Sequence, residues 1–169
     1  MVNVMRSAGI PARPVYVPRW SHCDDNHAWV EVWCDGDWHY LGACEPEAVL
    51  DKGWFTNAAS RAMMIGSRWY DRAMPDEKVI GKDGMNRIIN LLGKYAKTRW
   101  ITITVEDLDG TPAAGAKVRA EVMNYGEFSP IAIMEADKNG CISFETGFGS
   151  LLICAVYDLS LIHISEPTR

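Results

Sequence analysis

The sequence lacks the features that would place it among nucleic-acid-binding or membrane-spanning proteins. Its 169 residues carry a formal net charge of −5, and no basic patch or stripe interrupts this acidic balance. Nucleic acid is therefore not expected as the main partner. No apolar run approaches the roughly 18 residues of a membrane span, and we find no internal repeat or low-complexity tract. What remains is an ordinary globular composition, with length for one medium domain or two small ones.

The cysteines are too few and too irregularly spaced for a disulfide scaffold. No two of them form a CxxC pair, so a zinc knuckle is not expected. Cys34 and Cys44 lie on or beside neighbouring predicted strands, so one disulfide between them is an alternative. Buried free thiols are the favoured interpretation. The five positions are Cys23, Cys34, Cys44, Cys141 and Cys154.

One polar cluster contains residue types that bind zinc, namely His22, Cys23, Asp24, Asp25 and His27. Their spacing matches no familiar closed zinc site. The two adjacent aspartates are typical of a turn in a polar loop. We therefore do not expect a metal site in this cluster.

The first part of the chain predicts a helix followed by antiparallel strands. Residues 1–8 have apolar side chains at i, i+3, i+4 and i+7, although so short a helix is marginal alone. Strands are expected at 13–17, 27–33 and 38–41, with a hairpin turn at 35–37. A helix followed by an antiparallel sheet indicates an α+β fold.

The later segments differ in composition. Residues 45–70 contain aromatic and methionine side chains without a clean period, and 71–97 are polar, typical of a linker or wrapping segment with room for one helix. Short strands at about ten-residue spacing follow in 98–158 and indicate a β-sandwich that is incomplete. The expected organisation is a partial domain at 1–70, the segment 71–97 and a sandwich at 98–158.

The run from Gly9 to Glu47 resembles the distal half of a transglutaminase-like, papain-like cysteine enzyme core. It contains a GIPAR turn, then NHAWVEVW, then a Gly-Asp-Trp turn that leads to WHYLGACE. The resemblance covers roughly residues 1–60. It implies a cysteine nucleophile on an upstream helix, a histidine base in HAW, and an acid one strand later that orients this histidine.

Two residues carry the implied chemistry. His27 is the candidate base. The position where the family commonly has aspartate is Gly42, so Glu45 is the nearest candidate acid, with a solvated turn as the competing interpretation. Cys23 is not favoured as the nucleophile, because it lies on a loop and not at a helix N-terminus, where the pKa of a thiol is lowered. Nothing in the sequence would activate Cys44. The resemblance instead places the nucleophile about two helical turns before Met1, which is then an internal methionine. The resemblance implies no cofactor.

Two further resemblances concern the second part. VEDLDGTPAAGAKV resembles the start of a carboxypeptidase-regulatory-like or immunoglobulin-like module, and this resemblance covers 99–157. LSLIHISEPTR, at 159–169, resembles translated sequencing adapter, because one choice of codons reproduces the adapter without a mismatch. We therefore exclude 159–169 from fold reasoning.

Together these features predict a fragment of a cysteine enzyme that acts on protein or peptide amides by hydrolysis or acyl transfer. The fragment itself is expected to be inactive. Bacterial enzymes with an appended β-sandwich are often exported, so a periplasmic or cell-surface location is expected. The alternative is a non-catalytic protein- or glycan-binding module with a degenerate core, which Gly42 favours. A third possibility is a fragment that folds poorly and is poorly soluble.

Overall fold

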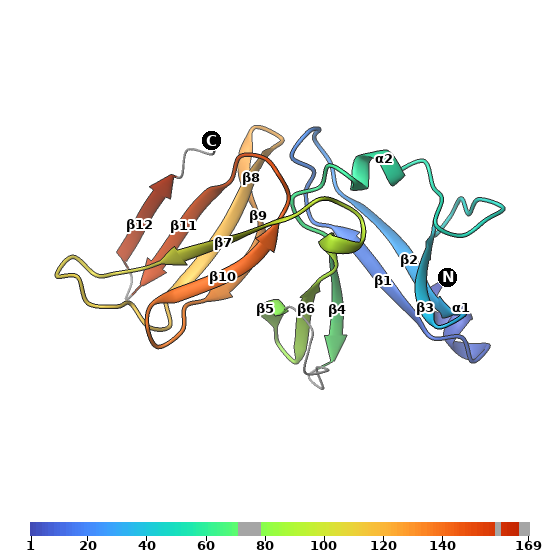
Figure 1. Ribbon diagram of the computed structural model, residues 1–169, viewed down its shortest axis with the longest axis horizontal. Helices are drawn as coiled ribbons and strands as arrows, with labels where there is room; N and C mark the ends of the chain where they lie inside the picture. The colour runs from blue at the N-terminus through green and yellow to red at the C-terminus, as the bar shows by residue number, and fades with distance from the viewer. Residues whose placement is uncertain (71–78, 158–159, 166–169) are drawn as a thin grey trace.

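The protein is mostly antiparallel sheet with few helices (Figure 1). The computed structural model describes residues 1–70, 79–157 and 160–165, and of residues 83 and 160–165 the backbone alone. Parts of the predicted linker (71–78) and of the adapter-like tail (159 and 166–169) lie outside the described residues. This β-rich architecture agrees with the coarse α+β expectation. Within the described residues, no helix is long and apolar enough to cross a membrane.

Six strands form the first sheet, in the order β3-β2-β1-β4-β6-β5, and all neighbours are antiparallel. Their bounds are β1 (Ala12–Val17), β2 (His27–Cys34), β3 (Asp37–Leu41), β4 (Gly66–Tyr70), β5 (Val79–Asp83) and β6 (Asn86–Asn90). β1 meets β4 only at Tyr16 and Gly66. The hairpin of β5 and β6 therefore diverges with β4 from the other three strands (Figure 1).

The helix and the three strands predicted at 1–41 are confirmed within a few residues. α1 (Val2–Ser7) packs on one face of β1, β2 and β3, where Val2 and Met5 contact a buried cluster that includes Val30 and Val32. Because side chains alternate along a strand, His27 and Trp29 project from the opposite face.

Residues 53–65 and 91–96 cover this opposite face. α2 (Thr56–Ala59) and the 3₁₀ turn η1 (Leu92–Lys94) contribute side chains to one buried cluster with β1 and β2. The fully buried members include Trp29, Phe55 and Ile65. The segment without a clean sequence period is therefore the layer that encloses this face.

The described part of 71–97 contains β5, β6 and η1 and no α-helix, so the helix considered for this segment is wrong over 79–97. Ile80 and Ile89 are buried here, and Ile88 packs against the same core as Ile80. These few apolar residues stand among polar ones, which concealed the two strands in the composition.

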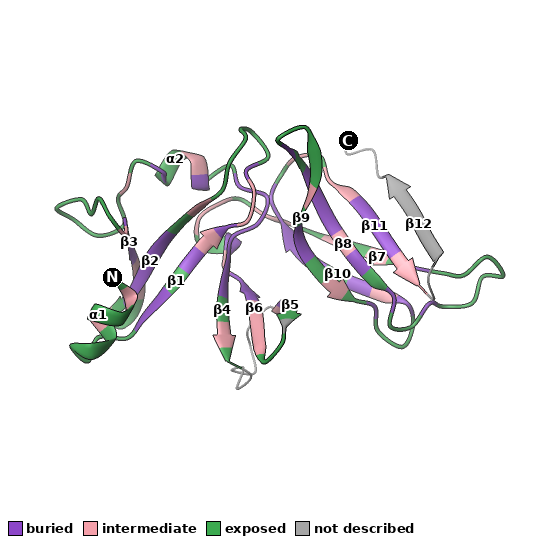
Figure 2. Ribbon diagram, turned by 180° about the vertical axis from the view of Figure 1, so that it is seen from behind, coloured by how far each residue is buried: buried purple, intermediate pink, exposed green. Residues whose placement is uncertain are grey.

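The remaining strands form a two-stranded sheet, β10-β7, and a four-stranded sheet, β12-β11-β8-β9. Their bounds are β7 (Arg99–Thr104), β8 (Lys117–Asn124), β9 (Glu127–Glu135), β10 (Cys141–Thr146), β11 (Leu152–Tyr157) and β12 (Ser160–Ser165). Side chains from both sheets share one buried cluster, and Figure 2 shows the buried positions along β8, β9, β10 and β11. β12, which falls in the adapter-like segment, pairs with β11 at the edge of its sheet.

The core of the second part extends into the first. Met63 and Met64 are fully buried in the cluster formed by β7 to β11, and Ile80 of β5 joins them. Thr146 Oγ1 donates a hydrogen bond to the Met63 carbonyl at 2.8 Å. The two halves of the described chain are therefore packed together along 62–64.

Candidate functional site

The GIPAR and HAWVEV motifs are joined by a buried ion pair. Arg13 and Glu31 are direct cross-strand partners on β1 and β2. Arg13 Nε donates to Glu31 Oε2 at 2.6 Å, and the two side chains are 8% and 0% exposed. The guanidinium also lies 4.1 Å from the ring centre of Trp38, a cation–π contact. Arg13 is thus a structural arginine whose partner is the glutamate of the second motif.

The other carboxylate oxygen of Glu31 also has partners. Tyr95 Oη donates to Glu31 Oε1 at 2.5 Å and accepts a hydrogen bond from Trp29 Nε1 at 3.0 Å. Burial and the neighbouring Glu31 charge raise the pKa of Tyr95 far above its usual range, so the phenol remains a donor. Lys94 Nζ lies 3.9 Å from the same oxygen. These groups compensate the buried carboxylate and fix strand β2 behind His27.

His27 opens β2 and is half-buried among aromatic rings. Its ring centre lies 4.6 Å from Trp54, 4.9 Å from Phe55 and 5.9 Å from Trp29. Burial lowers the pKa of His27, and the nearby charge of Asp25 opposes this shift. A neutral imidazole at pH 7 is the form that accepts a proton, as a general base must.

The structure does not bring Glu45 and His27 together. Glu45 is exposed, and no hydrogen bond or ion pair joins these two described side chains. The Glu45 carbonyl folds back over Gly42, where a Cβ atom would lie 2.6 Å from that oxygen. An aspartate at position 42 would therefore require a backbone shift in this turn. The acid whose charge acts on His27 is Asp25.

A second histidine–carboxylate pair, not predicted from the sequence, lies on the neighbouring strand. His39 Nδ1 and Asp51 Oδ2 are 2.5 Å apart, and the Tyr40 amide donates to Asp51 Oδ1 at 3.0 Å. Burial opposes the charged form of Asp51, but these hydrogen bonds outweigh it and lower its pKa. The pair attaches residue 51 to β3. No local pattern links positions 39 and 51 in the sequence.

The five cysteines are free thiols, so the disulfide considered between Cys34 and Cys44 does not form. Only Cys154 is buried, whereas Cys23 and Cys44 are exposed. No group of three histidine, cysteine, aspartate or glutamate side chains capable of holding a metal occurs among the described residues.

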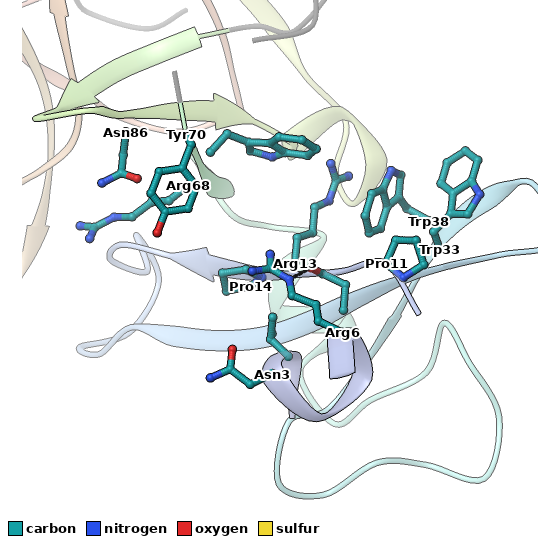
Figure 3. A pocket seen from close by; sticks show the side chains of 13 residues that line it. Asn3, Arg6, Pro11, Arg13, Pro14, Trp33, Trp38, Arg68, Tyr70 and Asn86 are labelled. Carbon is teal, nitrogen blue, oxygen red and sulfur yellow. Dashed lines mark hydrogen bonds between the residues drawn. The ribbon is translucent and has the colours of Figure 1, made fainter. Parts of the chain in front are cut away.

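A groove of about 800 Å³ lies between β1 and β4, where the first sheet diverges (Figure 3). Aromatic side chains, including Trp33, Trp38 and Tyr70, line it together with Arg68 and Asn86. Trp33 is 42% exposed and Tyr70 is 74% exposed. His27 is not among the lining residues, so this groove and the candidate base are separate features.

Comparison with known proteins supports the resemblance for the first part of the chain. Residues 1–43 match the family model described as Transglutaminase-like superfamily. The match spans α1 to β3 and therefore includes His27 and the Arg13–Glu31 pair. The resemblance to this superfamily is thereby confirmed over that segment. No protein of curated function and no solved structure matches the chain.

Proposed function

We propose that residues 1–70 are the distal part of a transglutaminase-like core in a cysteine enzyme that acts on protein or peptide amides. The observation that carries this proposal is the half-buried His27 at the start of β2, packed among aromatic rings where burial lowers its pKa. It lies in the segment that matches the superfamily. The buried Arg13–Glu31 pair supports it, since that pair fixes the strand that presents the histidine.

In this proposal a cysteine thiol upstream of Met1 supplies the nucleophile. His27 takes the thiol proton as the sulfur bonds to the amide carbonyl carbon. The same proton passes to the leaving amine as the C–N bond breaks, which leaves a thioester. Water completes hydrolysis, or a second amine completes acyl transfer, and the thiol is restored. No cofactor is required.

Glu45 is the orienting acid that the resemblance implies. Because it is exposed and not bonded to His27, its action requires movement of the 42–45 turn when substrate binds. We propose further that 98–157 is a β-sandwich module of the carboxypeptidase-regulatory-like or immunoglobulin-like kind. Its two sheets around one core support this proposal.

The first experiment is to read the DNA upstream of the Met1 codon. An in-frame cysteine roughly two helical turns upstream, opening the helix that continues as α1, supports the enzyme. A stop codon, or serine, alanine or glycine at that position, contradicts it. The protein that includes the cysteine is then assayed for release of amine from peptide amides.

In that assay we expect His27→Ala to lower kcat about 10²- to 10⁴-fold, the contribution typical of a general base. His39→Ala is the matched control, since His39 pairs with Asp51 outside the site and its removal should leave kcat within about twofold. Equal losses in the two variants would contradict the catalytic role of His27.

A second candidate function is a non-catalytic protein- or glycan-binding module. The groove with exposed Trp33 and Tyr70 favours it, because exposed aromatic faces supply large contact area. Tryptophan fluorescence titrated with peptides and with oligosaccharides tests this function. Binding that Trp33→Ala and Tyr70→Ala abolish, in a protein without amidase activity, would replace the enzyme proposal.

A further inference from the structure

One buried amide connects the second part of the molecule to the loop before His27. Asn124, at the end of β8, is 1% exposed. Its Nδ2 donates to the carbonyl oxygens of Trp20 at 2.9 Å, Cys23 at 3.0 Å and Asp25 at 3.3 Å. Three carbonyls from one six-residue stretch therefore converge on a side chain about a hundred residues later in the sequence.

The loop also contributes a side chain to the contact with the β8–β9 hairpin. Asp24 Oδ1 accepts a hydrogen bond from the Tyr125 amide at 2.5 Å. Tyr125 and Gly126 have φ of 53° and 74°, and Asn124 pairs with Glu127, which defines a tight two-residue hairpin turn. A rigid hairpin tip, rather than a loose loop, is thus seated on residues 20–25.

The loop that it contacts is also held by one backbone hydrogen bond and by the buried Trp20 ring. The Trp20 amide donates to the Asp25 carbonyl at 3.0 Å and closes the loop. Asp25 has φ of 150°, a conformation that residues other than glycine rarely adopt. Such backbone persists only where surrounding contacts fix it. His27 follows two residues later, and the buried Trp20 ring lies 6.5 Å from the imidazole.

The two ends of the Asn124 amide have different surroundings. Asn124 Oδ1 is buried and has no hydrogen-bond partner, and such an acceptor costs folding free energy. A reversed amide would direct this oxygen at three carbonyls, so the orientation is determined by the loop. The side chain therefore fixes a geometry at the cost of one unpaired oxygen.

We propose that Asn124 is a positioning residue for His27, through which the second part of the molecule holds the loop 20–25 in the conformation that the base requires. We call the contacts of Asn124 and Tyr125 with this loop the Asn124 clamp. Asn124 lies outside the superfamily match at 1–43. The positioning role rests on the proposed function, but the clamp is measurable in the 169-residue chain without a nucleophile.

The test compares Asn124→Ala and the milder Asn124→Ser with Asn139→Ala. Asn139 is the matched control because it is exposed and lies in the turn between β9 and β10, at the opposite end of β9 from the Tyr125 turn. None of these changes alters charge near His27. The His27 pKa is read by NMR titration of the ring, and amide exchange is read across residues 20–27.

Burial is the largest influence on His27, so a released loop admits water and the pKa rises toward its ordinary value. We expect the His27 pKa to rise in both Asn124 variants and the loop amides to exchange at least about tenfold faster. We expect neither change in Asn139→Ala. An unchanged or lower pKa in a folded Asn124 variant overturns the clamp, even if Tm falls.

A wild-type measurement covers the case in which the variants fail to fold. The clamp predicts that the Trp20 amide is protected from exchange as strongly as amides of the β8–β9 hairpin. Free exchange at Trp20 with a protected hairpin overturns it. If the clamp holds but His27→Ala retains full amidase activity, the proposed function fails and the clamp is a structural contact alone.

Discussion

At the scale of single residues, the buried Arg13–Glu31 pair joins two motifs of the matched segment. A buried carboxylate is costly unless it is paired and hydrogen-bonded, and Glu31 accepts from Arg13 and Tyr95 with its side chain fully buried. Arginine and glutamate in two separate motifs could be recognised in the sequence as a family signature. Their pairing required the register of β1 and β2, in which positions 13 and 31 are opposite.

We predict that Glu31→Gln lowers the free energy of unfolding by about 3–5 kcal/mol, because the Arg13 charge stays buried without a counter-ion. Chemical denaturation followed by tryptophan fluorescence measures the change. Glu47→Gln is the control, since Glu47 and Lys52 form an exposed pair at 3.9 Å that contributes about 0–1 kcal/mol. Similar losses in the two variants would contradict the prediction that the buried Arg13 charge depends on Glu31 as its counter-ion.

At the scale of elements, the sequence predicted what local patterns encode. The strands at 13–17, 27–33 and 38–41 were predictable from alternating and β-branched residues around an Asp-Gly turn. β5 and β6 were not, because Ile80 and Ile88 pack into the core of the second part, and no local pattern indicates this contact. The Asn124 clamp likewise depends on a partner that no local pattern identifies.

One close approach between elements gives a direct test of how the halves pack. A Cβ atom at Gly147 would lie 2.2 Å from the Ala62 carbonyl oxygen, so backbone would have to move. We predict that Gly147→Ala lowers the free energy of unfolding by about 1–3 kcal/mol, the usual cost of overpacking. Gly93→Ala is the control, because a Cβ there meets only ordinary contacts, the nearest at 3.4 Å. Thermal unfolding of the two variants gives the comparison. Equal midpoints for Gly147→Ala and Gly93→Ala would contradict the close packing at Gly147.

At the scale of the whole molecule, the shared core argues for one cooperative unit. Met63 and Met64 are fully buried against strands of the second part, and Thr146 bonds to the Met63 carbonyl. Separate domains usually have few contacts across their boundary. The packing along 62–64 implies that neither part unfolds without exposing apolar surface of the other. The division into domains at 1–70 and 98–158 remains a prediction.

We accordingly predict that the two parts unfold together. Tryptophan fluorescence reports mainly on residues 20–69, which contain all the tryptophans except the exposed Trp100. Amide exchange in β8 and β11 reports on the second part. Both probes should give one midpoint in denaturant, as two-state unfolding requires, and Gly147→Ala should lower both by the same amount. Separate midpoints in the wild-type protein would show that the buried methionines do not couple the unfolding of the two parts. If Gly147→Ala shifts the midpoint of one probe alone, the strain from the added Cβ is confined to the part that this probe reports.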